Sequence, residues 1–114
     1  NFGRAAVNDL ADALEGAGLP RKLMIDCSHA NSGKSHLVQA EVAQDVAGQI
    51  AEGSREIFGV MLESFLEDGN QAHSQKSGAD GLVYGQSITD ACMGWERTVP
   101  VLEQLAEAVR RRRG

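Results

Sequence analysis

Two short apolar stretches decide the predicted fold: KLMIDC at residues 22–27 and IFGVML at residues 57–62. Each has the length and composition of a strand buried on both faces, which is typical of parallel sheets. The segments before them, residues 4–17 and 35–51, have the periodicity of amphipathic helices. Gly18 and Gly53 follow these helices, as expected at a helix end. This alternation predicts an α/β fold with parallel strands.

The composition of the chain changes after residue 62. Residues 63–86 are rich in Gly, Ser, Asp, Asn and Gln, and so long a loop inside a compact domain is usually functional or disordered. Residues 87–92 are predicted to open a short helical turn, and Pro100 is predicted to start the last helix. The predicted order is therefore helix, strand, helix, strand, long loop and helix.

The length of the chain limits the possible architectures. With 114 residues, 42% of them apolar, and a net charge of −5, the chain describes at most one domain, since domains typically have about 100–150 residues. A complete (β/α)₈ barrel needs about 250 residues. Two strands buried on both faces also need parallel neighbours that this chain does not supply. Together with the absence of an initiator methionine, this predicts that the chain is a piece of a larger sheet.

The composition also argues against several partners and locations. Acidic residues outnumber basic residues by 16 to 11, so the chain lacks the positive surface that nucleic-acid binding needs. No stretch approaches the roughly 20 apolar residues of a membrane span, and no secretory signal is visible. The two cysteines, Cys27 and Cys92, fit neither a disulfide scaffold nor a CxxC zinc site. A cytoplasmic location without nucleic-acid or membrane partners is therefore predicted.

Polar side chains follow each predicted strand, at the edge where parallel α/β sheets carry their active sites. His29 follows the first strand, Glu63 follows the second, and the long loop supplies Asp90. Together they would form a mixed nitrogen and oxygen site that divalent metals accept. Each residue also has an ordinary interpretation: a hydrogen-bonded loop histidine, a glutamate paired with a lysine, and a helix-capping aspartate. From the residues alone, the metal site and these interpretations stay equally open.

Two other kinds of chemistry are disfavoured. Residues 28–35 end in Gly-Lys-Ser like a phosphate-binding P-loop, but Ser28 stands where that motif requires glycine. A Cys–His nucleophile pair would use Cys27 or Cys92, yet no cysteine-peptidase signature surrounds either, and both are predicted to be small buried thiols. His36 and His73 have no partner pattern and are predicted to be surface residues.

Four ordered motifs carry a resemblance to a known family: MIDCSHANS at residues 24–32, GVMLES at 59–64, GNQ at 69–71 and SITDACMGWE at 87–96. They resemble the C-terminal third of the microbial class I 3-deoxy-D-arabino-heptulosonate 7-phosphate (DAHP) synthases, over essentially the whole chain. The resemblance implies that residues 1–114 are a single segment. It would be the C-terminal portion of a (β/α)₈ TIM barrel, from the sixth helix through the seventh and eighth strands to the eighth helix.

The resemblance also implies a function. The family's enzymes condense phosphoenolpyruvate, erythrose 4-phosphate and water to DAHP and phosphate, the first step of the shikimate pathway and of aromatic amino acid biosynthesis. Their divalent metal ion, one of Mn, Fe, Co or Zn, is bound by a Cys, a His, a Glu and an Asp. The last three match His29, Glu63 and Asp90 in their motifs. The resemblance therefore implies that these are the catalytic and metal-binding residues.

One metal ligand and the substrate clamps have no counterpart in the chain. The family's cysteine ligand comes from an early strand, and neither Cys27 nor Cys92 occupies its motif. The basic motifs that hold both phosphorylated substrates also lie in earlier segments of the family. We therefore expect a homo-oligomeric synthase from the full-length protein and no synthase activity from these residues alone. The alternative is a non-catalytic half-barrel module that binds a metabolite or a partner protein.

Overall fold

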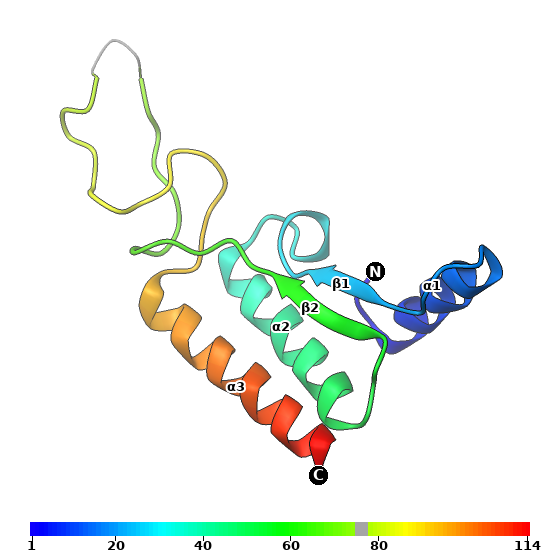
Figure 1. Ribbon diagram of the computed structural model, residues 1–114. Helices are drawn as coiled ribbons and strands as arrows, with labels where there is room; N and C mark the ends of the chain where they lie inside the picture. Colours follow the sequence, from blue (N-terminus) through cyan, green and yellow to red (C-terminus); the bar gives the residue numbers. More distant parts are fainter. Residues whose placement is uncertain (75–77) are drawn as a thin grey trace.

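The computed structural model describes residues 1–74 and 78–114 as alternating helices and strands (Figure 1). The elements, in chain order, are α1 (Arg4–Gly16), β1 (Leu23–Asp26), the 3₁₀ helix η1 (His29–Asn31), α2 (His36–Ala51), β2 (Ile57–Met61) and α3 (Trp95–Arg113). β1 and β2 pair in parallel, with Ile25 opposite Val60 and Asp26 opposite Met61. These observations confirm the predicted α/β fold with parallel strands.

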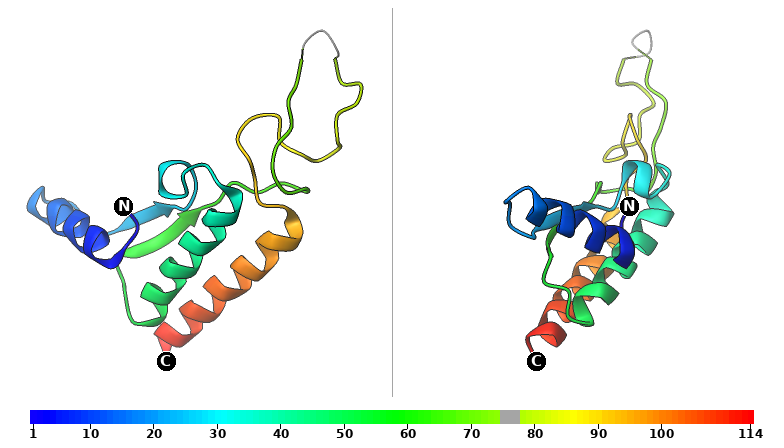
Figure 2. Two further views of the ribbon diagram at one scale, coloured as in Figure 1. Left: turned by 180° about the vertical axis from the view of Figure 1, so that it is seen from behind. Right: turned by 90° about the vertical axis from the view of Figure 1, so that its right-hand side faces the viewer.

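One face of the two-stranded sheet is covered by helices. Figures 1 and 2 show α2 and α3 side by side on this face, and α1 next to β1. Leu23, Ile25 and Ile57 are at most 7% exposed and belong to the hydrophobic core. The helices add the other buried core residues, among them Val7, Ala11, Val42, Val46, Ile50, Val101 and Ala108. Burial of this apolar surface holds the helices on the sheet.

The opposite face of the sheet is open within the described residues. Met24 is 53% exposed, Phe58 is 64% exposed and Met61 is 40% exposed. The prediction that the strands are buried on both faces is therefore wrong for the described residues, which cover one face only. Large apolar side chains on the uncovered face are typical of a surface that another element covers.

The start of the last helix differs from the prediction. α3 begins at Trp95, and Pro100 lies inside it, exposed to solvent. Proline there removes only the hydrogen bond to the carbonyl of Glu96, an exposed residue one turn earlier. Residues 87–92 form no helical turn, since Ser87 bridges to Asn70 and Cys92 bridges to Gly69. These long-range contacts take the place of the helical turn that the sequence suggested, and Ser87 Oγ accepts a hydrogen bond from the Thr89 N–H at 3.1 Å.

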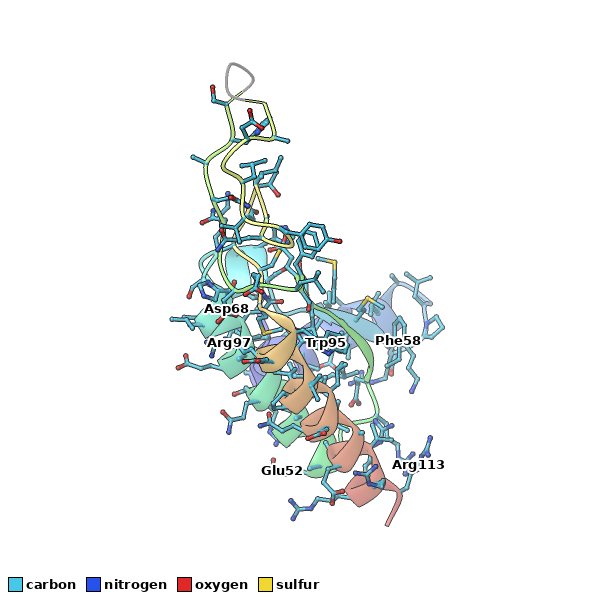
Figure 3. The ribbon with its side chains drawn as sticks, turned by 90° about the vertical axis from the view of Figure 1, so that its left-hand side faces the viewer. Glu52, Phe58, Asp68, Trp95, Arg97 and Arg113 are labelled. Atoms are coloured by element: carbon cyan, nitrogen blue, oxygen red, sulfur yellow. The ribbon has the colours of Figure 1, made fainter. Side chains whose placement is uncertain are left out.

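Asp68 fixes the beginning of α3. Its carboxylate accepts a hydrogen bond from the backbone of Gly94 at 2.6 Å and from Arg97 Nη2 at 2.9 Å. Figure 3 shows Asp68 and Arg97 next to each other at the first turn of the helix. The hydrogen bond from the Arg97 guanidinium, together with that from Gly94, lowers the pKa of Asp68 to about 2. The polar loop is thereby tied to Gly94, the residue before α3, which lies 26 residues after Asp68 in the chain.

The lowered pKa of Asp68 predicts a pH-dependent contribution to stability. Because the pKa falls from 3.8 to about 2, the ionised carboxylate stabilises the fold above pH 4, and this contribution is lost as the pH falls towards 2. We expect Asp68→Asn to lower the free energy of unfolding at neutral pH by only about 1 kcal/mol, since the pair is partly exposed and screened. Thermal unfolding across pH should show a smaller loss between pH 4 and 2 in the variant.

Glu107→Gln is the matched control for this measurement. Glu107 pairs with Arg110 at 2.9 Å, but both side chains are more than half exposed. We expect this variant to keep the native pH dependence. An identical pH dependence in Asp68→Asn and the native protein would contradict the prediction.

Candidate metal centre

The structure brings His29, Glu63 and Asp90 together at the carboxyl ends of the strands. His29 lies in η1, Glu63 follows β2, and Asp90 comes from the long loop. One ligand atom from each lies within 4.8 Å of the others. His29 Nε2 is 3.1 Å from Glu63 Oε1 and 4.0 Å from Asp90 Oδ2. All three predicted residues therefore point into one cluster.

Two of the ordinary interpretations of these residues do not describe this geometry. Asp90 caps no helix, because α3 begins five residues later, at Trp95. The Glu63 carboxylate faces the imidazole of His29. The cluster is partly open to solvent, with side-chain exposures of 45% for His29, 24% for Glu63 and 38% for Asp90. Its donor atoms are thus accessible to an ion and to further ligands.

Asp26 orients the imidazole of His29. Its Oδ2 lies 2.9 Å from His29 Nδ1, while its Oδ1 accepts a hydrogen bond from the backbone of Ser28 at 2.8 Å. The Ser28 hydroxyl donates to the same carboxylate, and Asn31 donates to the Asp26 carbonyl at 2.8 Å. A proton held on Nδ1 leaves the Nε2 lone pair directed at Glu63 and Asp90, as metal-ligating histidines require.

The backbone of His29 has an unusual conformation. Its φ of 52° lies in the left-handed region, which non-glycine residues seldom adopt. This conformation lets the chain turn sharply after β1 and still return the imidazole towards Asp26. The left-handed geometry belongs to the tight segment after β1, in which Lys34 also has a positive φ, of 63°.

The charges around His29 favour a cation. The hydrogen bond with Asp26 and the charge of Glu63 raise the pKa of His29 above its ordinary value. Burial alone would raise the pKa of Asp26, but its hydrogen bonds with Ser28 and His29 outweigh this and lower it. Three carboxylates thus surround one imidazole, and a divalent cation would replace the proton on Nε2 and offset their repulsion.

The other candidate groups take no part in this cluster. Cys27 is fully buried, and burial raises the pKa of its thiol to about 11. Cys92 is half-buried, with its Sγ 3.6 Å from the carbonyl of Asp90. Residues 28–35 include the turn η1, and the Ser28 side chain binds Asp26. His73 is exposed, as predicted, whereas His36 is half-buried at the start of α2.

Comparison with known proteins identifies the family. The chain matches the family described as "DAHP synthetase I family" over residues 1–103. The chain belongs to this family. The resemblance of the four motifs to class I DAHP synthases is thereby confirmed.

Similar proteins support this membership across the whole chain. The chain is 52% identical to the Phe-sensitive phospho-2-dehydro-3-deoxyheptonate aldolase of Escherichia coli, covering 100% of this chain and 32% of that protein. It is 49% identical to the tyrosine-inhibited aldolase of Schizosaccharomyces pombe, covering 99% and 31%. The structure of the aldolase from Francisella tularensis SCHU S4 is similar, with a TM-score of 0.91, 48% identity and coverage of 100% and 32%. The chain thus spans about a third of these DAHP synthetase family relatives.

The sequence patterns missed Asp26 as part of the site. Asp26 is the last residue of β1, and the sequence patterns assign it no role at the site. Its spacing of three residues before His29 was the available signal, since the turn between them brings both side chains together. A carboxylate three residues before a histidine is common in loops, so this spacing indicates a contact only when the conformation of the turn between them is known.

Asp26 generates a prediction about metal affinity. We expect Asp26→Asn to weaken the binding of Co²⁺ by about 10- to 100-fold, because the loss of charge no longer holds the proton on Nδ1 of His29. Isothermal titration with Co²⁺ measures this change in the full-length protein. Asp12→Asn is the control, since Asp12 pairs with Arg21 at the surface of α1. Equal Co²⁺ affinity in Asp26→Asn and the native protein would refute the role of Asp26.

Proposed function

We propose that this chain is part of a DAHP synthase, which joins phosphoenolpyruvate to erythrose 4-phosphate and releases phosphate. The observation that carries the proposal is the cluster of His29, Glu63 and Asp90 in a member of the DAHP synthetase I family. The motifs of the family and the convergence of these side chains support the same reaction.

We also propose that residues 1–114 form one segment, the C-terminal portion of a (β/α)₈ barrel. Two parallel strands with helices on one face support this architecture. The exposed Met24, Phe58 and Met61 on the other face supply the apolar surface that a barrel interior would bury. The remaining strands of the barrel would then come from outside the residues of this chain.

His29, Glu63 and Asp90 are proposed to hold a divalent cation, one of Mn, Fe, Co or Zn. One imidazole nitrogen and two carboxylates, within 4.8 Å of one another, suit such an ion. When bound, the cation supplies Lewis-acid polarisation of the aldehyde oxygen of erythrose 4-phosphate. Asp26 keeps the proton on Nδ1 of His29, and the carboxylates of Glu63 and Asp90 provide the negative charge that holds the ion.

The position of the cluster suits a reaction with two substrates. It lies at the carboxyl ends of β1 and β2, where α/β enzymes bind their ligands. The partial exposure of its side chains leaves one side of the cluster accessible. We expect the fourth metal ligand, the phosphate-binding residues and the contacts of a homo-oligomer to come from the rest of a full-length synthase.

Among the described residues, no helix combines the length and apolar character that crossing a membrane needs.

Replacing each candidate ligand tests the proposed function. In the full-length synthase, we expect His29→Ala, Glu63→Ala and Asp90→Ala each to lower bound metal and to reduce turnover by more than about 100-fold, because the ion loses a direct ligand. Metal analysis and a condensation assay measure both effects. The control is His73→Ala, since His73 is an exposed loop residue. Full metal occupancy with native turnover would remove that residue from the site.

A condensation assay on the isolated chain tests whether these residues are sufficient for the reaction, and the ligand replacements in the full-length synthase separate the synthase from a binding module. The open apolar face of the sheet is the observation that favours the alternative, a half-barrel that binds a metabolite or a partner protein. We expect 114 residues alone to show no condensation, because they lack the fourth ligand and the phosphate clamps. Condensation by the isolated chain at the rate of a full-length synthase would overturn this expectation.

A further inference from the structure

Gln39 is a buried polar residue that contacts the backbone of Glu63. It lies in α2 and is 1% exposed. Its Oε1 accepts a hydrogen bond from the Glu63 N–H at 2.6 Å, and its Nε2 donates to the Glu63 carbonyl at 3.2 Å. The carboxamide thus pairs with one residue through both its donor and its acceptor, as a neighbouring strand would.

This pairing occurs where the strand ladder has already ended. β2 ends at Met61, and the last backbone bond between the strands runs from Cys27 N–H to the Met61 carbonyl at 2.9 Å. Glu63 therefore lies beyond the part of the chain that β1 holds. The Gln39 side chain supplies the constraint that the ladder no longer provides.

The same backbone group connects Glu63 to the loop of Asp90. The Glu63 carbonyl also accepts a hydrogen bond from Met93 N–H at 3.0 Å, and Phe65 N–H donates to the Met93 carbonyl at 2.9 Å. Met93 is completely buried and follows Asp90 by three residues. The buried Gln39 and Met93 thus join α2, the end of β2 and the loop through the backbone of Glu63.

Packing alone does not account for glutamine at this position. The other buried residues of α2 near it are apolar, among them Val42, Ala43 and Val46. Burying a carboxamide costs free energy unless its donor and acceptor are both satisfied, and ordering a long side chain costs entropy. The two hydrogen bonds to the backbone of Glu63 offset this cost, and they also hold that backbone in place.

We propose that Gln39 is a positioning residue of the metal centre: its buried carboxamide fixes the backbone of Glu63 so that the carboxylate meets Nε2 of His29. The proposal rests on the proposed function, in which Glu63 is a metal ligand. Gln39 touches neither metal nor substrate in this arrangement. It acts through the placement of Glu63 and, through Met93, of the segment that carries Asp90.

The test compares two buried glutamines of the same helix. Gln49 is 5% exposed and donates to the Phe2 carbonyl and to Asp45, both at 2.7 Å. Gln39→Met and Gln49→Met, made in the full-length synthase, each remove a buried carboxamide of similar size. The probe is Co²⁺ added to the metal-free protein, followed by titration and by its visible absorption spectrum.

We expect Gln39→Met to weaken Co²⁺ binding by about 10- to 100-fold, as losses of partners that orient metal ligands do. The Co²⁺ spectrum should also change, because the spectrum depends on coordination geometry and a loss of stability alone does not alter it. Gln49→Met should keep the native spectrum and affinity even if it unfolds at a lower temperature. Native affinity and spectrum in folded Gln39→Met would overturn the proposal.

Two further variants keep the outcomes distinct. His29→Ala lowers Co²⁺ binding if the proposed metal centre exists, so unchanged binding in that variant refutes the function rather than the role of Gln39. If Gln39→Met does not fold, Gln39→Asn keeps the carboxamide on a side chain one methylene shorter, which cannot make both bonds to Glu63. Weakened Co²⁺ binding in Gln39→Asn supports the proposal, and native binding refutes it.

Discussion

The parallel pairing of β1 with β2 is the constraint on which the rest of the site depends. Asp26 lies opposite Met61, and the Cys27 N–H closes the ladder on the Met61 carbonyl. Because both strands run in the same direction, the residues that follow them leave the sheet at the same edge. His29 and Glu63 are therefore neighbours although α2 separates them in the sequence. An antiparallel pair would have placed them at opposite ends.

The pairing brings the residues together, and polar contacts beyond the ladder set their geometry. Asp26 fixes the imidazole of His29, and Gln39 contacts the backbone of Glu63. The carboxamide of Gln39 is buried, where its hydrogen bonds are stronger than in water, whereas the Asp26–His29 contact is partly exposed. The resulting cluster concentrates negative charge around His29. A divalent cation would be bound favourably by this concentration of negative charge.

Sequence patterns predicted the parts of this structure that depend on local periodicity. The strands and the first two helices follow the apolar spacing, and His29 and Glu63 follow from their places after the strands. The start of α3 did not follow, because the backbone N–H of its N-cap residue, Gly94, is bound by Asp68, which is distant in sequence. Gln39 was missed for the same reason, because its partner Glu63 is distant in sequence. Asp26 was missed although His29 is only three residues away, because apolar spacing does not reveal the turn that brings the two side chains together. The metal role of the cluster was suggested by the motifs together and by no single residue.

The two buried glutamines of α2 are the same residue type, and only their positions in the fold distinguish their roles. α2 follows β1 and runs back along the sheet (Figure 1). Gln39, in the first turn of α2, pairs with Glu63 beyond the carboxyl end of β2, and Gln49 lies in the last turn of α2, towards the amino ends of the strands. Gln49 ties the helix to the Phe2 carbonyl, a contact that joins α2 to the segment before α1. In parallel α/β folds the carboxyl edge carries chemistry and the opposite edge carries stability. Two buried residues of one type, on one helix, therefore serve different ends of the sheet.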